Sequence, residues 1–229
     1  MIAIMQPYLF PYLGYFQLIH AVDTFVLYDD VNYIKKGYIN RNNILNQGEP
    51  LRITIPVLDV SQNKKINEHY FSTDVQKILK TIQTAYFKAP YFNQVYPMIE
   101  AVLLQNDRKV SNVCYAAIQE ILTYLGLKRE VLLSSQLDYD RDLPAADKLM
   151  DITKLLGHKE YVNSIGGQSL YDTKYFNEND INLLFIKMQS VIYKQNCCDF
   201  VPNLSIIDIL MWNDISKINT LLQSYDFFR

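Results

Sequence analysis

Three tyrosines and a glycine stand close together in the stretch QPYLFPYLGYFQ, residues 6–17. Tyr12, Gly14 and Tyr15 are expected near the start of a helix, where unpaired backbone N–H groups suit a phosphate. Tyrosine hydroxyls form hydrogen bonds, and tyrosine rings offer apolar faces. We therefore predict that Tyr12 and Tyr15 are catalytic and that Gln6, Gly14 and Gln17 contact a ligand. The alternative is a packed aromatic turn whose hydroxyls are satisfied within the protein.

A pair of acids opens the second segment, YDDVNYIKKGYINRNN, at residues 28–43. Asp29 and Asp30 end a strand-like run. Such a pair can accept hydrogen bonds from the hydroxyls of a ribose or another sugar, or hold Mg²⁺ through its oxygens. We predict that both acids bind a substrate or a nucleotide. No resident metal is predicted, and Mg²⁺ brought in with a nucleotide is the one cofactor considered.

Cations and amides follow the acids in the same segment. Lys35, Lys36 and Arg41 can neutralise phosphate charge, and we predict a catalytic role for Lys36 and Arg41. Asn40 and Asn42 suit a hydroxyl-rich ligand. The alternative is a solvated loop whose surface ion pairs contribute little to stability. The interleaved aromatic residues favour a docked loop.

A third polar segment, NSIGGQSLYD at residues 163–172, follows another strand-like run. Ser164, Gly166 and Gly167 can form a nest of backbone N–H groups for an anion. The alternative is an ordinary tight turn.

The elements that position these residues follow from the hydrophobic pattern. Strand-like runs occur at residues 2–6, 24–29, 51–57, 131–137, 160–165 and 181–188, and helical patterns at 12–21, 144–157, 204–212 and 216–225. Strand and helix alternate at both ends of the chain, around a helical block at about 72–126. This order predicts one α/β domain over residues 1–229, with a Rossmann-like, mostly parallel sheet and helices on both faces. Ligands bind outside the carboxyl ends of such strands, where the three polar segments are expected to meet.

The composition narrows the class of protein. The net charge of −2 argues against a strong footprint for nucleic acid, and no apolar run is long enough for a membrane span. The three cysteines match neither a disulfide framework nor zinc-ligand spacing. No signal peptide is recognised at the start of the chain. We therefore expect a cytoplasmic protein that acts on a small molecule, with its oligomeric state left open.

Long and unusual strings in the chain resemble the WbqC-like family of bacteria. They are MQPYLFPYLGYFQLIHAVDTFVLYDDVNYIKKGYINRN, SIGGQSLYD, YKQ at 193–195 and FVPNLSIIDIL at 200–210. The resemblance covers nearly the whole chain. It implies a role in surface polysaccharide or O-antigen biosynthesis, and a transferase that acts on aminoacyl groups or sugars.

The opening stretch is also similar in layout to the HxGH nucleotidyltransferase superfamily, although this likeness is fainter. On that template Tyr12 and Tyr15 stand where the two histidines belong, and Gly14 matches the glycine. Tyrosine is neutral at pH 7 and donates only a neutral hydrogen bond. Nucleotidyl transfer is therefore implied only if the cations of the second segment, or a metal, supply positive charge.

Residues and resemblance together predict a transferase that binds a nucleotide or a nucleotide-linked sugar. The group transferred to an amino sugar is expected to be an aminoacyl or acyl group. Two alternatives stay open. One is a non-catalytic protein that binds a nucleotide or a sugar, and the other is an interaction partner of glycan-synthesis enzymes.

Overall fold

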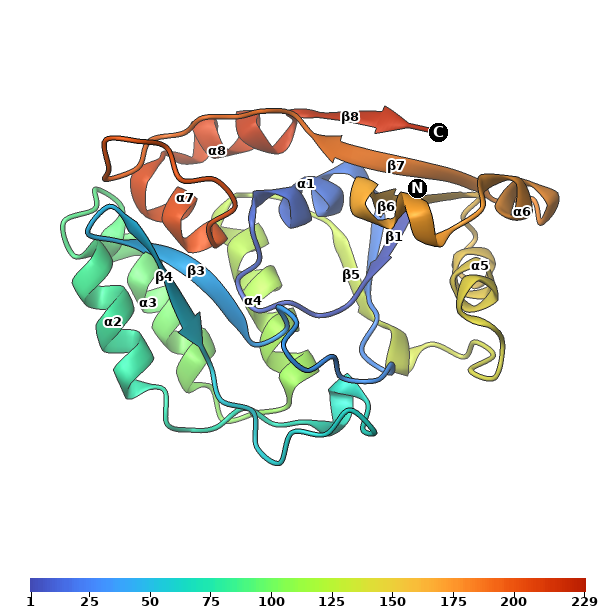
Figure 1. Cartoon of the computed structure of the whole chain (residues 1–229), viewed down its shortest axis with the longest axis horizontal. Helices are drawn as coiled ribbons and strands as arrows, with labels where there is room; N and C mark the ends of the chain where they lie inside the picture. Colours follow the sequence, from blue (N-terminus) through green and yellow to red (C-terminus); the bar gives the residue numbers. More distant parts are fainter.

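A six-stranded sheet runs through the middle of the molecule in the computed structural model, which describes residues 1–229 (Figure 1). Its strands follow the order β5-β2-β1-β6-β7-β8. Their bounds are β1 Ile2–Met5, β2 Thr24–Leu27, β5 Glu130–Leu133, β6 Glu160–Ser164, β7 Asn182–Met188 and β8 Tyr225–Phe228. All pair in parallel except β8, which runs antiparallel to β7. The predicted mostly parallel α/β sheet is confirmed.

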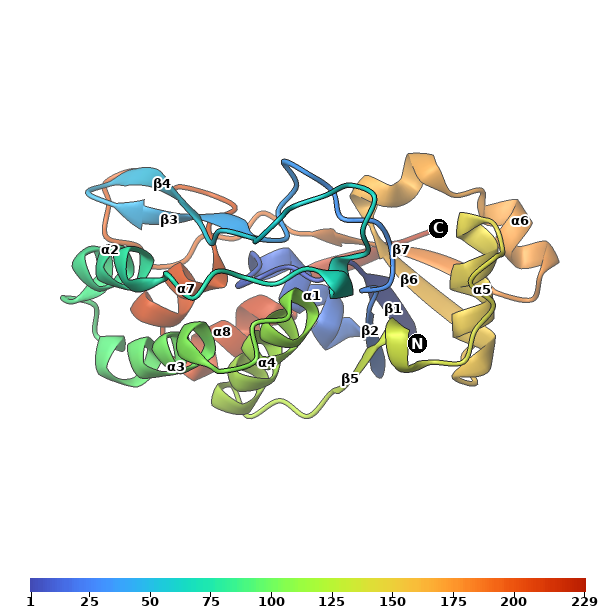
Figure 2. The same ribbon diagram turned by 90° about the horizontal axis from the view of Figure 1, so that it is seen from below.

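Alternation of side chains along these strands builds a core on each face of the sheet. In β1, Ala3 belongs to a cluster of 50 buried residues, whereas Ile2 and Ile4 belong to a cluster of 12 on the other face. Helices α5 (Ala145–Leu155) and α6 (Thr173–Glu178) cover the smaller cluster (Figure 2). Helix α1 (Leu13–Ala21) packs on the larger one. The strands are therefore buried on both sides, which explains their nearly continuous apolar runs.

The expected helical block lies between the second and third strands of the parallel sheet. It consists of α2, α3 and α4, at Gln76–Tyr86, Phe92–Leu104 and Val110–Tyr124. Gly126, just beyond α4, has a positive φ of 70°, as is usual after a helix end. Helices α7 (Ile206–Trp212) and α8 (Ile215–Leu222) complete this side of the molecule. None of the helices combines the length and the apolar character needed to cross a membrane.

A two-stranded hairpin outside the main sheet differs from the sequence-based expectation. Strands β3 (Arg41–Asn46) and β4 (Glu49–Thr54) pair antiparallel, whereas only a strand at 51–57 was expected. Gln47 and Gly48 both have positive φ values, 52° and 84°, as the tight hairpin turn requires. The polar start of β3 concealed it from a hydrophobic pattern. Strand β8 and helix α6 were also not predicted.

Asp208 connects three of these elements from a fully buried position in the first turn of α7. The hydroxyl of Tyr86, from α2, donates a 3.0 Å hydrogen bond to Oδ1 of Asp208. The same hydroxyl accepts a 3.0 Å hydrogen bond from the N–H of Leu45 in β3. Asp208 has no cationic partner. Burial raises the pKa of its carboxyl to about 6, although the hydrogen bond from Tyr86 acts in the opposite direction.

The Asp208→Asn variant tests this buried carboxyl. Because the pKa is raised on folding, the carboxyl supports the fold fully below the pKa of the unfolded chain. This contribution to stability is lost as the pH rises through the pKa of about 6 that the carboxyl has in the folded protein. The free energy of unfolding of the wild type, minus that of the variant, should therefore fall by about 2 kcal/mol between pH 4.5 and pH 7.5. Urea denaturation at both pH values measures it, and a constant difference would contradict the shifted pKa.

Candidate functional site

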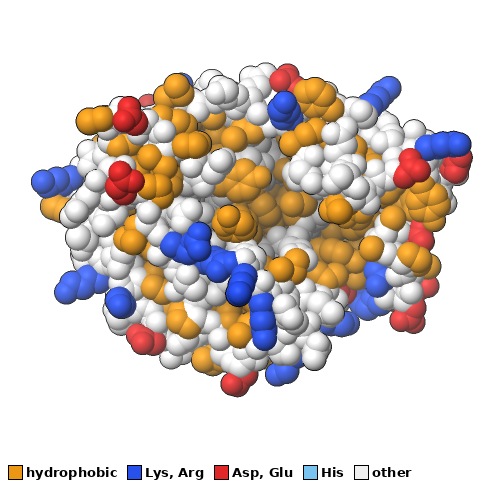
Figure 3. Space-filling model, viewed as in Figure 1, with side chains coloured by type: hydrophobic (Ala, Val, Ile, Leu, Met, Phe, Trp, Pro, Cys, Tyr) orange, Lys and Arg blue, Asp and Glu red, His pale blue; other side chains and the backbone are white.

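A cavity of about 560 Å³ lies at the carboxyl ends of β1, β2 and β6. From β1 the chain continues to β2 and β5 on one side of the sheet, and it returns with β6 and β7 on the other. The loops that follow β1 and β6 therefore diverge, which makes this place the topological switch point of the sheet. The space-filling view shows the molecule hollowed here, with hydrophobic side chains around the hollow (Figure 3).

The structure brings the three polar segments together around this cavity. Its lining includes Gln6, Tyr12, Gly14 and Tyr15 from the first segment, Ile34, Gly37 and Tyr38 from the second, and Asn163, Ser164, Gly166 and Gly167 from the third. These segments are far apart in the sequence. They meet because parallel strands place all their carboxyl ends at one edge of the sheet.

The lining contains no charged side chain and no histidine. Six of its members are tyrosines, namely Tyr8, Tyr12, Tyr15, Tyr28, Tyr38 and Tyr171. The hydroxyl of Tyr15 donates a 2.9 Å hydrogen bond to the carbonyl of Gln6, whereas those of Tyr12, Tyr38 and Tyr171 have no partner within the chain. An aromatic cavity with a few free polar groups is the usual form of a small-molecule site.

Burial keeps the hydroxyls of Tyr8, Tyr12 and Tyr15 protonated at physiological pH by raising their pKa values. Burial raises the pKa of Tyr12, and burial together with the nearby Tyr38 and Tyr12 raises that of Tyr8. The pKa of the fully buried Tyr15 is raised well above its ordinary value for the same main reason. Their hydroxyls therefore act as neutral donors and acceptors, and none of them supplies a phenolate base.

A strained residue fixes the tyrosine wall of the cavity. Phe10 is buried and has a φ of +46°, a left-handed conformation that costs about 1–3 kcal/mol for a side chain of this size. Its carbonyl accepts two 2.7 Å hydrogen bonds, one from Nδ2 of Asn42 and one from Oγ of Ser205. The next carbonyl, that of Pro11, accepts from the N–H of Ile206 at 2.8 Å. Two distant segments, at Asn42 and at Ser205–Ile206, thus hold the turn that presents Tyr12.

Two glycines allow side chains of the lining to pack closely against the backbone. A Cβ atom at Gly14 would lie 2.5 Å from Cε2 of Tyr12, so the ring of Tyr12 covers the start of α1. A Cβ atom at Gly167 would lie 3.0 Å from Nδ2 of Asn163. A larger residue at Gly14 would displace the ring of Tyr12 and change the shape of the cavity.

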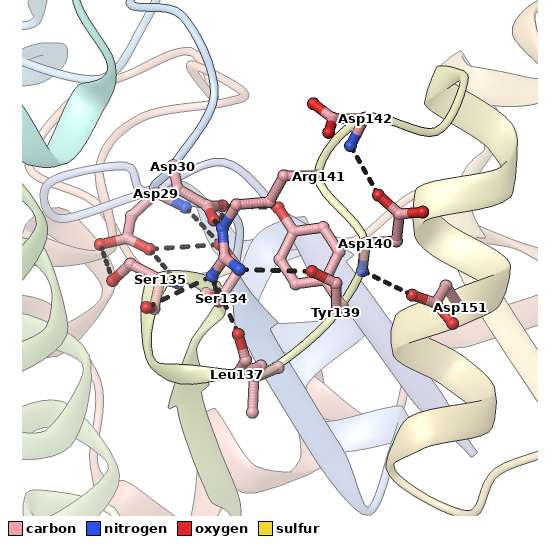
Figure 4. A network of polar contacts seen from close by, with 10 residues as sticks. All are labelled: Asp29, Asp30, Ser134, Ser135, Leu137, Tyr139, Asp140, Arg141, Asp142 and Asp151. Carbon is pink, nitrogen blue, oxygen red and sulfur yellow. Dashed lines mark hydrogen bonds and ion pairs between the residues drawn. The ribbon is translucent and has the colours of Figure 1, made fainter.

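The acid pair does not line the cavity, and its carboxylates contact residues that follow β5 (Figure 4). Asp29 accepts 2.9 Å hydrogen bonds from the N–H and the Oγ of Ser135. Asp30 accepts from the hydroxyl of Tyr139 at 2.9 Å, and it pairs with Nε of Arg141 at 2.9 Å. Every carboxylate oxygen of the pair thus has at least one hydrogen-bond or ion-pair partner within the protein.

The partners of the acid pair were not identified from the sequence. Ser134, Ser135, Tyr139 and Arg141 all follow β5, and Oγ of Ser134 contacts both acids. The available signal was the polar run SSQLDYDRD, which begins where β5 ends. Because β2 and β5 are neighbours in the sheet, a pairing between the residues that follow them is what the topology favours.

The predicted cations lie at the rim of the cavity. Lys35 and Lys36 are exposed, and they stand in a turn between Ile34 and Gly37, which both line the cavity. Lys36 has a φ of +62°, and neither lysine has an ion-pair partner. Nε of Arg41 donates a 2.6 Å hydrogen bond to the carbonyl of Gly37. Figure 3 shows Lys and Arg side chains along one edge of the hollow.

The remaining predicted residues hold the surrounding loops and do not line the cavity. Nε2 of Gln17 donates to the carbonyls of Leu221 and Ser224, at 2.8 and 3.0 Å. Nδ2 of Asn40 donates to the carbonyl of Ile55 at 2.8 Å. Like Asn42, these two amides contribute to the shape of the site through the backbone that they fix.

Replacing Arg141 tests the network around the acid pair. Asp30 is buried, so Arg141→Met leaves its carboxylate with neutral partners only. We expect the free energy of unfolding to fall by about 2–4 kcal/mol, because an uncompensated buried charge is costly. Arg141→Lys keeps the charge and should lose less than half as much. Equal stability of the wild type and Arg141→Met in urea denaturation would show that the pair contributes nothing.

Comparison with known proteins identifies relatives of the chain. The chain is 28% identical over 214 residues to the uncharacterized protein Rv1507c of Mycobacterium tuberculosis. The aligned region covers 91% of this chain and 92% of that protein. No solved structure matches the chain. The model of the WbqC-like protein family matches residues 6–220, which include all three segments around the cavity. The chain therefore belongs to the WbqC-like protein family.

Proposed function

We propose that the protein binds a nucleotide-linked amino sugar at the switch-point cavity and transfers an acyl or aminoacyl group to its amine. The observation that carries the proposal is a neutral, tyrosine-lined cavity with two unpaired lysines at its rim. The setting, bacterial surface polysaccharide or O-antigen biosynthesis, rests on what the family resemblance implies.

The distribution of charge matches the two parts of such a ligand. The sugar hydroxyls are uncharged, so they suit the free hydroxyl of Tyr171 and the amide of Asn163. A diphosphate carries negative charge, which Lys35 and Lys36 neutralise where the ligand leaves the cavity. In this arrangement Arg41 keeps the lysine turn in place through the carbonyl of Gly37.

The absence of a carboxylate from the lining favours acylation of an amine. An amine in a neutral, partly desolvated cavity is destabilised in its protonated form, so its pKa falls and it loses a proton to solvent. The nitrogen lone pair then attacks the carbonyl carbon of an activated acyl group, and a C–N bond forms. The bond to the leaving group breaks with its electron pair, and the second proton of the nitrogen passes to that group.

Within this proposal Tyr12 and Tyr15 have different roles. The free hydroxyl of Tyr12 donates to the acyl oxygen as negative charge develops on it. The hydroxyl of Tyr15 is occupied by the carbonyl of Gln6, so Tyr15 positions the loop that follows β1.

A second candidate function is binding of a nucleotide sugar without catalysis. It is favoured by one observation, namely that the cavity lining includes no carboxylate, histidine, cysteine or lysine as a general acid or base. Tests of binding and of turnover separate the two candidates.

Binding is tested with UDP-glucosamine. At a concentration of about 100 times Kd, the ligand should raise the melting temperature by about 5–10 °C. The double variant Lys35→Ala/Lys36→Ala should weaken binding at least tenfold, because the phosphates lose two charged donors. The matched control is Lys77→Ala/Lys80→Ala, which removes two exposed lysines from α2. No shift with any of several nucleotide sugars, or equal losses in both double variants, would refute the proposed site.

Turnover is tested with UDP-glucosamine and an acyl thioester as the donor, with the N-acylated product followed by mass spectrometry. Tyr12→Phe should lower kcat by about 10²–10³-fold and leave KM for the sugar nearly unchanged. The control is Tyr70→Phe, which alters an exposed tyrosine that does not line the cavity. Binding without any product from the wild type would favour the second candidate function.

A further inference from the structure

A second hollow, of about 400 Å³, lies beside the switch-point cavity and shares a wall with it. The side chains common to both linings are Tyr8, Tyr12 and Tyr38. The rings of Tyr8 and Tyr38 lie 5.7 Å apart between centroids, so they form one aromatic partition. The other side of the hollow comes from the β3–β4 hairpin and from residues 201–204. A molecule in either hollow would therefore contact the same tyrosines.

The lining of the second hollow is uncharged and carries two free amides. The side chains of Asn43 and Asn203 line it, and neither forms a hydrogen bond within the chain. Pro50, Pro202 and Leu204 supply apolar surface. This combination suits an uncharged chain that contains amide groups, because each asparagine side chain both donates to and accepts from an amide. It does not suit a free ammonium group, for which the lining has no carboxylate.

Hydrogen bonds from both sides fix the walls of this hollow. The carbonyl of Asn43 accepts a 2.8 Å hydrogen bond from the N–H of Ser205. The side chain of Gln195 holds the segment that precedes Ser205 by two hydrogen bonds to Val201. Its Nε2 donates to the carbonyl of Val201 at 2.8 Å, and its Oε1 accepts from the N–H of Val201 at 2.9 Å. Asn203 has a φ of +58°, a left-handed conformation that asparagine tolerates better than most residues. The hollow is thus built into the fold.

We propose that the second hollow binds the acyl donor, a thioester on an uncharged, amide-containing arm of the pantetheine type. This inference rests on the proposed function of the first cavity. The two reacting groups meet at the edge of the tyrosine partition beside Tyr12, which borders both hollows, and there the sugar amine attacks the thioester carbonyl carbon. A C–N bond forms, the C–S bond breaks, and the sulfur leaves as a thiol after it takes the proton from the nitrogen.

Two tryptophan variants separate the hollows. Val201 lines only the second hollow and Leu170 lines only the first. Val201→Trp should weaken binding of S-acetylpantetheine at least tenfold and leave binding of UDP-glucosamine unchanged. Leu170→Trp should have the opposite effect. Both affinities are measured by isothermal titration calorimetry, after circular dichroism has shown that each variant is folded. Asn203→Ala, which removes one amide, should weaken S-acetylpantetheine binding several-fold and serves if Val201→Trp does not fold.

The outcomes for the two hollows are independent. Unchanged S-acetylpantetheine affinity in Val201→Trp and Asn203→Ala overturns the second site. Competition between S-acetylpantetheine and UDP-glucosamine, or no binding of S-acetylpantetheine at millimolar concentration, also overturns it. None of these results bears on the first cavity, which is tested separately by the binding of UDP-glucosamine. The proposal for the second hollow can therefore fail while the proposed function of the first cavity stands.

Discussion

The carbonyl oxygen of Phe10 is the point on which the arrangement of the site depends. Phe10 holds a left-handed backbone conformation, and its carbonyl receives hydrogen bonds from Asn42 at the hairpin and Ser205 before α7. These two donors offset the local strain, and they join segments that are more than 30 and 190 residues away. The turn that results places Tyr12 over the start of α1. Both hollows share this side chain, so their geometry follows from one pair of hydrogen bonds.

The ring of Tyr12 also changes how this fold can receive a charged ligand. In doubly wound folds the start of the first helix commonly receives a phosphate, because its N–H groups are unpaired. Here the ring packs on Gly14 at that position, and the cavity floor carries no charge. The nearest free cations of the second segment, Lys35 and Lys36, lie at the rim. We therefore propose that a ligand with a neutral and an anionic part binds with its neutral part inside the cavity.

The fold was largely predictable from the sequence, and the site only in part. IAIM, TFVL and INLLFIKM are buried on both faces of the sheet, so their apolar runs identify strands. RNNILN begins with polar residues and forms a hairpin away from the sheet, so the pattern did not indicate a strand. Three polar segments at strand ends were expected to meet, and they do. The direction of Asp29 and Asp30 depends on Ser134 and Arg141, over 100 residues later, and no local pattern contains that information.

A crystal structure of the protein with bound UDP-glucosamine tests the central claim most directly. We expect the glucosamine ring to lie among Tyr12, Tyr171 and Asn163, with the diphosphate beside Lys35 and Lys36 and the uridine outside the cavity. A sugar ring bound elsewhere on the molecule, or a diphosphate inside the tyrosine cavity with the lysines unused, would contradict it.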